Sequence, residues 1–447
     1  MKTAYKIRGF IKSASLAKAI AISLIVIMAI CTGIAAHDYV PGERQSHPIL
    51  LKGGNLHTIS NGLMEHSDIL FENGRITNIG INLTLPDNTE IIDVTGQEVY
   101  PGIIAPATSI GLSEIGAVRA TNDTREIGVI NPNVKSRIAY NPDSEIIPSV
   151  RAHGITTVLV VPGGSVITGI SSLINLDGWT VEDAAEKIDL GLHVNWPGVS
   201  GGGGRYGRRQ NPEQQRERQM QAREDLYQIF RDARTYYNAR QTDAEMKIDE
   251  RWEAMMPIFS EGMPVFITAN DYRQIEQAVS FSKEFGLKII ISGGGDAWMC
   301  TELLKENDIP VITRYVEGTP QRSDEAYDMA FTLPAMLAEG GVKFCIGQTG
   351  GTGTRNLPFQ AGRAAGNGLT REEALRAITL STAEILGVAD DLGSLEIGKK
   401  ATIVISEGDI MDMITQNVIL EYIEGRKVDL NNKHKELYEK YRQKSLN

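Results

Sequence analysis

The amino-acid sequence predicts an α/β protein in which a closed barrel is joined to a β-sandwich built from both chain ends. Between residues 97 and 387, eight apolar runs of strand composition alternate with helical patterns, as in parallel sheets with crossover helices. Short strand-like runs fill 48–96 and return at 388–430. The 447 residues, 42% hydrophobic and 23% charged, suffice for one barrel and a smaller unit.

The first 36 residues are predicted to be a signal peptide. They contain five Lys or Arg residues, no Asp or Glu, an apolar run at 19–30 and small residues up to Ala36. We therefore expect cleavage near Ala36 and export to the periplasm or the extracellular space. An uncleaved single-span membrane anchor is the alternative. Residues 37–47 are expected to form a tether.

The mature chain is predicted to be acidic, because loss of this segment moves the formal net charge from −11 to −16. An acidic protein repels polyanions such as nucleic acid. No second hydrophobic run is long enough to span a bilayer. The sequence thus predicts no nucleic-acid partner and no membrane partner beyond the signal segment.

The two chain ends carry the predicted sandwich, which we expect to be a small antiparallel module. Turn sequences such as Asn61-Gly62 and Asn73-Gly74 separate its amino-terminal strands. The expected strands are 49–59, 67–72, 74–79, 90–94, 400–406 and 418–424.

The barrel is expected to span 97–387. Its predicted strands are 99–104, 155–161, 171–176, 191–196, 265–269, 288–292, 311–316 and 342–347, and its clearest helices are 272–285, 297–307 and 325–339. A polar insertion at 201–251 begins with four glycines and continues as an amphipathic surface helix with Leu226, Ile229, Phe230 and Tyr236 on one face. A helix is expected at 431–447.

Several motifs resemble those of one enzyme family. They are NGRI at 73–76, QEVYPGII at 97–104, HGITTV at 153–158, RNLP at 355–358, EEALRAIT at 372–379, AEILG at 383–387 and GSLEIGKKA at 393–401. On these motifs, which follow the family's order, the chain is identified as a member of the metal-dependent amidohydrolase superfamily, in its imidazolonepropionase-like branch.

The resemblance implies a (β/α)8 TIM barrel with a composite β-sandwich. Family members typically hydrolyse non-peptide C–N bonds with one or two divalent metals, normally zinc, that lower the pKa of a bound water. The active site is expected at the carboxyl ends of the barrel strands.

The positions that would hold these metals are largely substituted in this chain. Hydroxyl and backbone oxygens are poor zinc ligands beside imidazole, thiolate and carboxylate groups. The sequence therefore predicts no dinuclear centre and no cofactor. The positions that correspond to family ligands are Ala107, Ser109, His193, Thr268, Gly293 and Gly350.

His193 and Asp296 are the candidate catalytic residues. His193 is expected at the carboxyl end of the fourth strand, where a hydrogen-bonded structural histidine is the alternative. Asp296 follows three glycines and opens a helix, so it is either a general base or an N-cap.

Four residues are candidates for substrate binding. Asn270 ends the fifth strand, and Arg355 and Asn356 follow a Gly-rich loop of the kind that binds anions in barrels. The alternative is that Arg355 and Asn356 only tie this loop to the barrel. Ser165 lies in the loop after the second strand but has no recognisable His–carboxylate partner for nucleophilic catalysis.

Two functions follow from this pattern. The first is a divergent amidohydrolase relative that lacks the dinuclear site and serves as a ligand-binding or accessory protein. Such a protein would bind a small molecule. It would also assemble as a homo-oligomer or with a paralogous amidohydrolase. The second is an active hydrolase with a relocated site around His193, either metal-free or mononuclear.

Overall fold

The computed structural model describes residues 39–198, 211–243, 245–320, 322–323, 325–347 and 350–446. The predicted signal peptide at 1–36, the start of the tether and the glycine run at 201–204 lie outside these ranges. Within them, no helix combines the length and the apolar character that crossing a bilayer requires.

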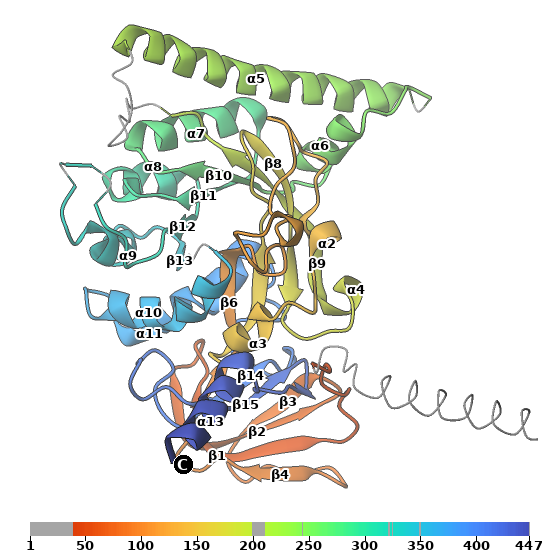
Figure 1. Cartoon of the computed structure of the whole chain (residues 1–447), viewed down its shortest axis with the longest axis vertical. Helices are drawn as coiled ribbons and strands as arrows, with labels where there is room; N and C mark the ends of the chain where they lie inside the picture. Colours follow the sequence, from red (N-terminus) through yellow and green to blue (C-terminus); the bar gives the residue numbers. More distant parts are fainter. Residues whose placement is uncertain are drawn as a thin grey trace, which may run out of the picture. The chain divides into compact units, whose positions relative to one another are not determined.

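An eight-stranded sheet forms a nearly closed barrel (Figure 1). Its order is β13-β12-β11-β10-β9-β8-β7-β6. The predicted fold class, an α/β barrel with a strand-rich unit, is confirmed. The strands are β6 Ile103–Thr108, β7 Ile155–Val160, β8 Ile167–Asn175, β9 Ala185–Asn195, β10 Val265–Ala269, β11 Ile289–Gly293, β12 Val311–Thr313 and β13 Phe344–Ile346.

One apolar layer fills the barrel interior, because every strand contributes an inward-facing residue to the same buried cluster. Helix α12 (Leu380–Leu386) adds Ala383, Ile385 and Leu386 to it. This layer is a packed floor on which a site at the strand ends can be built. The strand residues are Ile104, Leu159, Leu173, Leu190, Phe266, Ile290, Ile312 and Cys345.

The expectation of an entirely parallel barrel was wrong at one strand. β8 runs antiparallel to both β7 and β9. Only residues 161–166 connect β7 to β8, whereas a parallel pair needs a crossover of a dozen or more residues. The chain therefore turns back as a hairpin, and the amino end of β8 lies beside the carboxyl ends of its neighbours.

The predicted strand at 99–104 is in fact two strands. β5 (Glu98–Pro101) belongs to the strand-rich sheet, whereas β6 begins the barrel at Ile103. Gly102 separates them, and a Cβ atom there would lie 2.1 Å from Thr156 Oγ1. The chain can pass from one sheet to the other here because this residue has no side chain.

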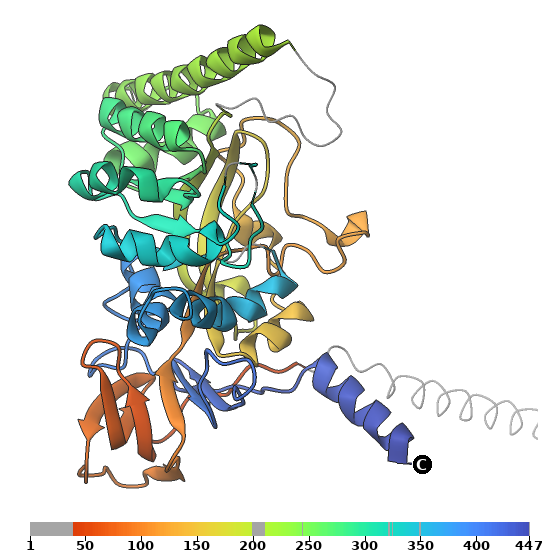
Figure 2. The same ribbon diagram turned by 90° about the vertical axis from the view of Figure 1, so that its left-hand side faces the viewer.

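The strand-rich unit is a mixed sheet, not the antiparallel module that the sequence suggested. It joins strands from both chain ends, drawn side by side in red-orange and blue in Figure 2. β1 pairs antiparallel with β2 but parallel with β4 and then β5. The hairpin β2–β3 returns the chain to the other edge of β1, which explains the parallel pairs. The remaining bounds are β1 Ile49–His57, β2 Leu63–Glu72, β3 Arg75–Gly80, β4 Glu90–Asp93, β14 Ile403–Ser406, β15 Val418–Ile423 and β16 Arg426–Lys427.

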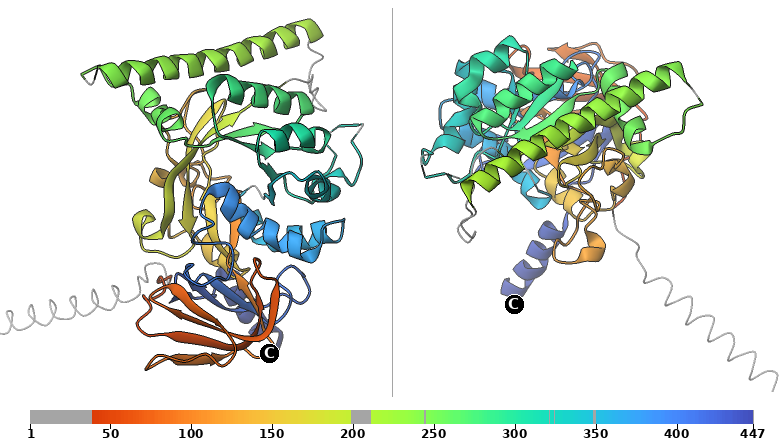
Figure 3. Two further views of the ribbon diagram at one scale, coloured as in Figure 1. Left: turned by 180° about the vertical axis from the view of Figure 1, so that it is seen from behind. Right: turned by 90° about the horizontal axis from the view of Figure 1, so that it is seen from above.

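Helices cover the outer face of the barrel. The long helix α5 (Pro212–Thr242) crosses over α7 (Tyr272–Phe285), as Figure 3 shows. Phe230 of α5 packs against Phe281 and Phe285 of α7, with ring centroids 4.8 and 5.7 Å apart. The other main helices are α3 Ile146–Arg151, α6 Glu250–Ser260, α8 Thr301–Glu306, α9 Met329–Glu339, α10 Leu357–Ala365, α11 Arg371–Ala377 and α13 Lys433–Leu446.

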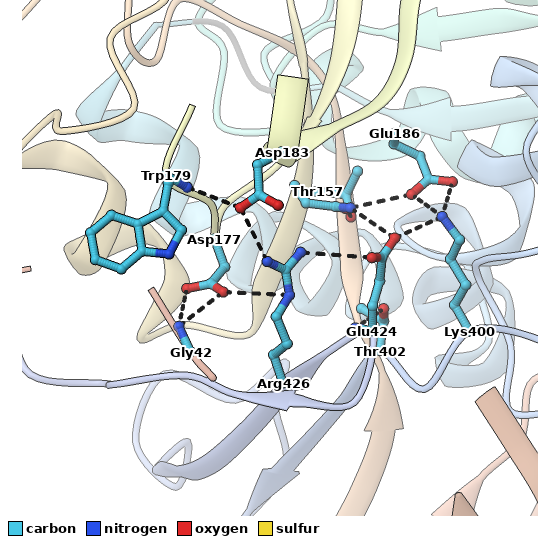
Figure 4. A network of polar contacts seen from close by, with 11 residues as sticks. Gly42, Thr157, Asp177, Trp179, Asp183, Glu186, Lys400, Thr402, Glu424 and Arg426 are labelled. Atoms are coloured by element: carbon cyan, nitrogen blue, oxygen red, sulfur yellow. Dashed lines mark hydrogen bonds and ion pairs between the residues drawn. The ribbon is translucent and has the colours of Figure 1, made fainter. Parts of the chain in front are cut away.

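A network of charged side chains links the barrel to the strand-rich sheet (Figure 4). Lys400 Nζ lies 2.7 Å from Glu186 Oε2 at the start of β9 and 2.7 Å from Glu424 Oε1 after β15. Asp177, after β8, pairs with Arg151 of α3 at 3.1 Å, and both side chains are fully buried. These contacts fix the sheet against the end of the barrel opposite the carboxyl ends of its parallel strands.

Candidate functional site

A cavity of about 460 Å³ lies at the carboxyl ends of the parallel barrel strands. Residues that end β6, β9, β10, β11, β12 and β13 line it, and Thr168 at the amino end of the reversed β8 completes the ring. Its volume falls within the range of small-molecule sites in proteins, roughly 300–1,000 Å³. The position is the one at which barrels of this type carry their sites.

The alternation of side chains along each strand determines which residues reach the cavity. Phe266 belongs to the inner layer, so Thr268, two positions later in β10, continues the inward-facing series and lines the cavity. In β9, His193 and Asn195 line the cavity, one residue out of step with Leu190 of the inner layer, because the register of β8 against β9 shifts between Lys187 and Gly191. A Cβ at Gly191 would lie 2.4 Å from the Phe266 ring, so this glycine makes room for the ring under the site.

His193 is a buried, neutral imidazole. Its ring stacks on Phe266 with centroids 4.5 Å apart and planes 3° from parallel. Burial lowers the pKa of His193 to about 3, because the charged form would lose its hydration. Nε2 is buried and has no hydrogen-bond partner in the described part of the chain. The ring can therefore donate or accept a proton in a hydrogen bond with a ligand, depending on its tautomer.

Two further polar atoms around the cavity are buried without partners among the described residues. They are Asn270 Oδ1 and Thr313 Oγ1. Asn270 is held beside Gly293, where a Cβ would lie 2.4 Å from Oδ1. Buried polar atoms without partners are costly, so a bound molecule that hydrogen-bonds to them would be stabilised.

The six positions that correspond to family metal ligands all lie on this cavity. They come from five different strands or strand ends, yet the fold brings them together. They are Ala107, Ser109, His193, Thr268, Gly293 and Gly350.

Asp296 does not line the cavity. Its two carboxylate oxygens lie 2.6 and 2.7 Å from the guanidinium of Arg322, and one also accepts a hydrogen bond from the backbone N–H of Tyr272. It precedes the short helix Ala297–Cys300 without capping it through its side chain. The carboxylate is thus committed to an ion pair.

Of the four predicted substrate-binding residues, only Asn270 lines the cavity. Arg355 is in the short helix Thr352–Asn356, where its charge acts on His153, and Asn356 is exposed. Ser165 borders a separate pocket under the loop at 116–128, and its carbonyl oxygen accepts a hydrogen bond of 2.6 Å from Asn195 Nδ2.

Thr313 and Arg314 also line the cavity and were not predicted as site residues. One strand was predicted over 311–316, but β12 ends at Thr313 and the backbone N–H of Arg314 donates to Gly293 O at 3.1 Å. A charged residue inside the apolar run VITRYV was the available signal for a strand end.

The cavity residues do not fit the divalent metals that the resemblance implies. A zinc site draws three or four ligands from imidazole, thiolate and carboxylate groups. His193 is the one such group in the cavity lining, and residues 348 and 349, outside the described ranges, are Gln and Thr. Throughout the described ranges no three His, Cys, Asp or Glu residues come together as a metal-binding group.

Comparisons with known proteins point to one family. The model of the amidohydrolase family matches residues 299–433. The amidohydrolase tasK of Hapsidospora irregularis is 21% identical over 383 residues, which are 76% of this chain and 38% of that protein. A dihydroorotase of Geobacter metallireducens is 41% identical over 56 residues, 12% of this chain and 13% of its own length. The chain thus spans well under half of the length of these relatives.

Solved structures extend the likeness over the whole fold. The crystal structure of an amidohydrolase from Thermotoga maritima has a TM-score of 0.74 and 26% identity, and the match covers 85% of this chain and 99% of that one. A molinate hydrolase shares the fold with a TM-score of 0.53 at 15% identity, over 88% of this chain and 96% of that one. Barrel, strand-rich sheet and sequence matches agree, and together they support assignment of the chain to the metal-dependent amidohydrolase superfamily.

Proposed function

We propose that this chain binds a small molecule in the barrel cavity, as a ligand-binding or accessory member of its superfamily, without metal-dependent hydrolysis. The observation that carries this proposal is the composition of the cavity lining. All six positions that correspond to family ligands lie on it, but the described lining contains one imidazole and no carboxylate or thiolate. Such a donor set favours hydrogen bonding over the holding of a catalytic cation.

The lining supports binding in two ways. Phe266, Ile312 and Val161 supply apolar surface, whose burial against a ligand is favourable. His193, Asn270 and Thr313 contribute buried polar atoms without partners in the described ranges, which would orient a ligand. The chemistry available to the protein is therefore recognition through hydrogen bonds and apolar contact.

The alternative is an active hydrolase with a relocated site at His193. In this alternative, Asp296 and Arg355 belong to the site together with His193. The structure favours it less. Asp296 pairs with Arg322, and neither Asp296 nor Arg355 lines the cavity. His193 alone would then have to activate water.

The test combines metal analysis with binding and turnover. The full chain is purified without chelators, its divalent metals are measured by mass spectrometry, and amide and dipeptide substrates are assayed with and without added zinc or manganese. We expect less than one metal per chain, no turnover, and calorimetric binding of small amides that His193→Ala weakens. His434→Ala, in the exposed helix α13, is the matched control.

Stoichiometric metal together with turnover that His193→Ala abolishes would overturn the proposal in favour of the hydrolase. Turnover that survives in His193→Ala would overturn it as well, because it would locate the chemistry elsewhere.

A further inference from the structure

One formal charge faces the cavity, and it is positive. Arg314 is the sole Lys, Arg, Asp or Glu residue in the described lining, and His193 is neutral. The protein as a whole carries a formal net charge of −11. The cavity therefore differs in sign from the average surface around it.

Among the described residues, the guanidinium of Arg314 has no partner. In the described ranges its guanidinium makes no hydrogen bond and no ion pair, although it is only partly exposed. Nearby arginines behave differently, since Arg322 binds Asp296 and Arg363 lies 3.2 Å from Glu317. A partly buried guanidinium without an acceptor loses hydration without compensation. A bound anion would supply both a hydrogen-bond acceptor and a counter-charge.

The sheet fixes Arg314 in a position facing the cavity. It lies one residue after the end of β12 and lines the cavity. Its backbone N–H donates to Gly293 O, which ties the end of β12 to the end of β11. Arg314 is thus presented by two paired strands and not by a loose loop.

The remaining polar groups define what else the ligand must offer. Asn270 Oδ1 is an acceptor and lacks a donor among the described residues. The hydroxyl of Thr313 and the imidazole of His193 can accept as well as donate. A molecule with an N–H or O–H group next to its anionic group would satisfy these atoms, while its apolar part would lie against Phe266.

We propose that the cavity selects small anionic molecules, in which a carboxylate or phosphate group pairs with Arg314 and a neighbouring amide or hydroxyl donor meets Asn270. This inference rests on the proposed function, since it names the ligand class of the same cavity. Arg314 is its specificity-determining residue.

The experiment compares an acid with its uncharged amide and adds a phosphate as a second anion. Binding of N-acetyl-L-leucine, its uncharged amide and isopentyl phosphate to the full chain is measured by titration calorimetry at low and high salt. A charge-assisted pair adds roughly 10- to 100-fold in affinity. We expect the acid to bind at least about tenfold tighter than the amide, with a preference that falls as salt rises. Comparison of isopentyl phosphate with N-acetyl-L-leucine shows whether the cavity prefers a phosphate or a carboxylate group.

Variants connect this preference to one side chain. Arg314→Gln should abolish the preference for the acid, because it weakens binding of the acid more than binding of the amide. Arg314→Lys should retain part of the preference, because lysine keeps the charge but not the two-pronged geometry. The matched control is Arg376→Gln, since Arg376 pairs with Glu384 on the outer surface. Thermal unfolding of each variant without ligand verifies that it is folded.

The outcomes separate the two proposals. Equal binding of acid and amide by the native protein, or equal weakening of both in Arg314→Gln, would refute the selection of anions and leave a ligand-binding cavity. Metal-dependent hydrolysis of N-acetyl-L-leucine would refute the proposed function, whereas a charge preference lost in Arg314→Gln would still support the role of Arg314.

Discussion

The environment of His193 determines its protonation state. The ring lies on Phe266 and has no carboxylate partner among the described residues, so nothing offsets the loss of hydration on burial. Its pKa of about 3 lies below the ordinary value of 6.5. The unfolded chain therefore takes up a proton before the folded one does, and stability falls as the pH drops from about 6.5 towards the folded pKa.

Replacing His193 with Gln should reduce the acid sensitivity of the fold. Between pH 7 and pH 5 the neutral, buried imidazole costs the native protein about 2 kcal/mol relative to an unperturbed histidine. The free energy of unfolding, measured by urea denaturation at both pH values, should therefore change less in His193→Gln, while the exposed His434→Gln behaves as the native chain. An NMR titration of His193 with a midpoint near 6.5 would contradict this expectation.

Residue by residue, the site was only partly predictable. The family motifs fix the strand order, so positions such as Thr268 and Gly293 could be placed on one cavity from the sequence. The orientation of Asp296 depends on Arg322, 26 residues later, and no local pattern encodes that pair. The position of Arg314 at the cavity was not predicted, because the apolar residues on both sides of it continue the pattern of a strand.

At the scale of elements, the amphipathic face of α5 anchors the 201–251 insertion to the barrel. Leu226, Phe230 and Ala233 are at most 1% exposed, although the helix is polar along most of its length. Aromatic contacts with α7 contribute beyond the buried area itself. The buried face is short, so single residues in it contribute much of the packing energy between α5 and the barrel.

Phe230→Ala should destabilise the protein by about 3–5 kcal/mol, because it leaves a cavity between α5 and α7. Met220 lies in the same helix and is 54% exposed, so Met220→Ala should change the free energy of unfolding by less than about 0.5 kcal/mol. Urea denaturation of both variants measures the difference. Similar small losses in the two would show that α5 is not anchored through Phe230.

Among the elements, helix α7 was predicted with its observed bounds, because Asp271 caps its start and Gly286 ends it in a left-handed conformation. β8 was predicted as a strand but with the wrong direction. An apolar run contains no information about orientation. The short connection at 161–166, with its Pro-Gly-Gly sequence, was the clue to a hairpin.

At the scale of the molecule, fully buried charges join the barrel to the strand-rich sheet. Arg151 and Asp177 form an ion pair without any exposure, and Arg151 also donates to the carbonyl of Asp429 at 2.6 Å. A buried pair adds little net stability, yet losing one partner leaves an uncompensated charge. This pair therefore acts mainly on how the two sheets are held together, and Asp177 also contacts Arg426 in the network of Figure 4.

Asp177→Asn should lower the free energy of unfolding by about 3–5 kcal/mol, since it leaves the Arg151 cation buried without its counter-charge. Glu384→Gln is the control, because the Arg376–Glu384 pair is 38% and 44% exposed and such pairs contribute less than about 1 kcal/mol. Chemical denaturation compares the two. Equal effects would mean that water reaches the Arg151 site.

The pairing of β5 with β14 has a consequence for synthesis on the ribosome. Pro101 pairs with Ile403, about 300 residues later, and at roughly 5–20 residues per second the nascent chain needs about 15–60 s to reach that partner. During this time one edge of β5 has no neighbour and can join foreign strands. The amino-terminal strands therefore cannot complete their sheet until β14 to β16 have emerged.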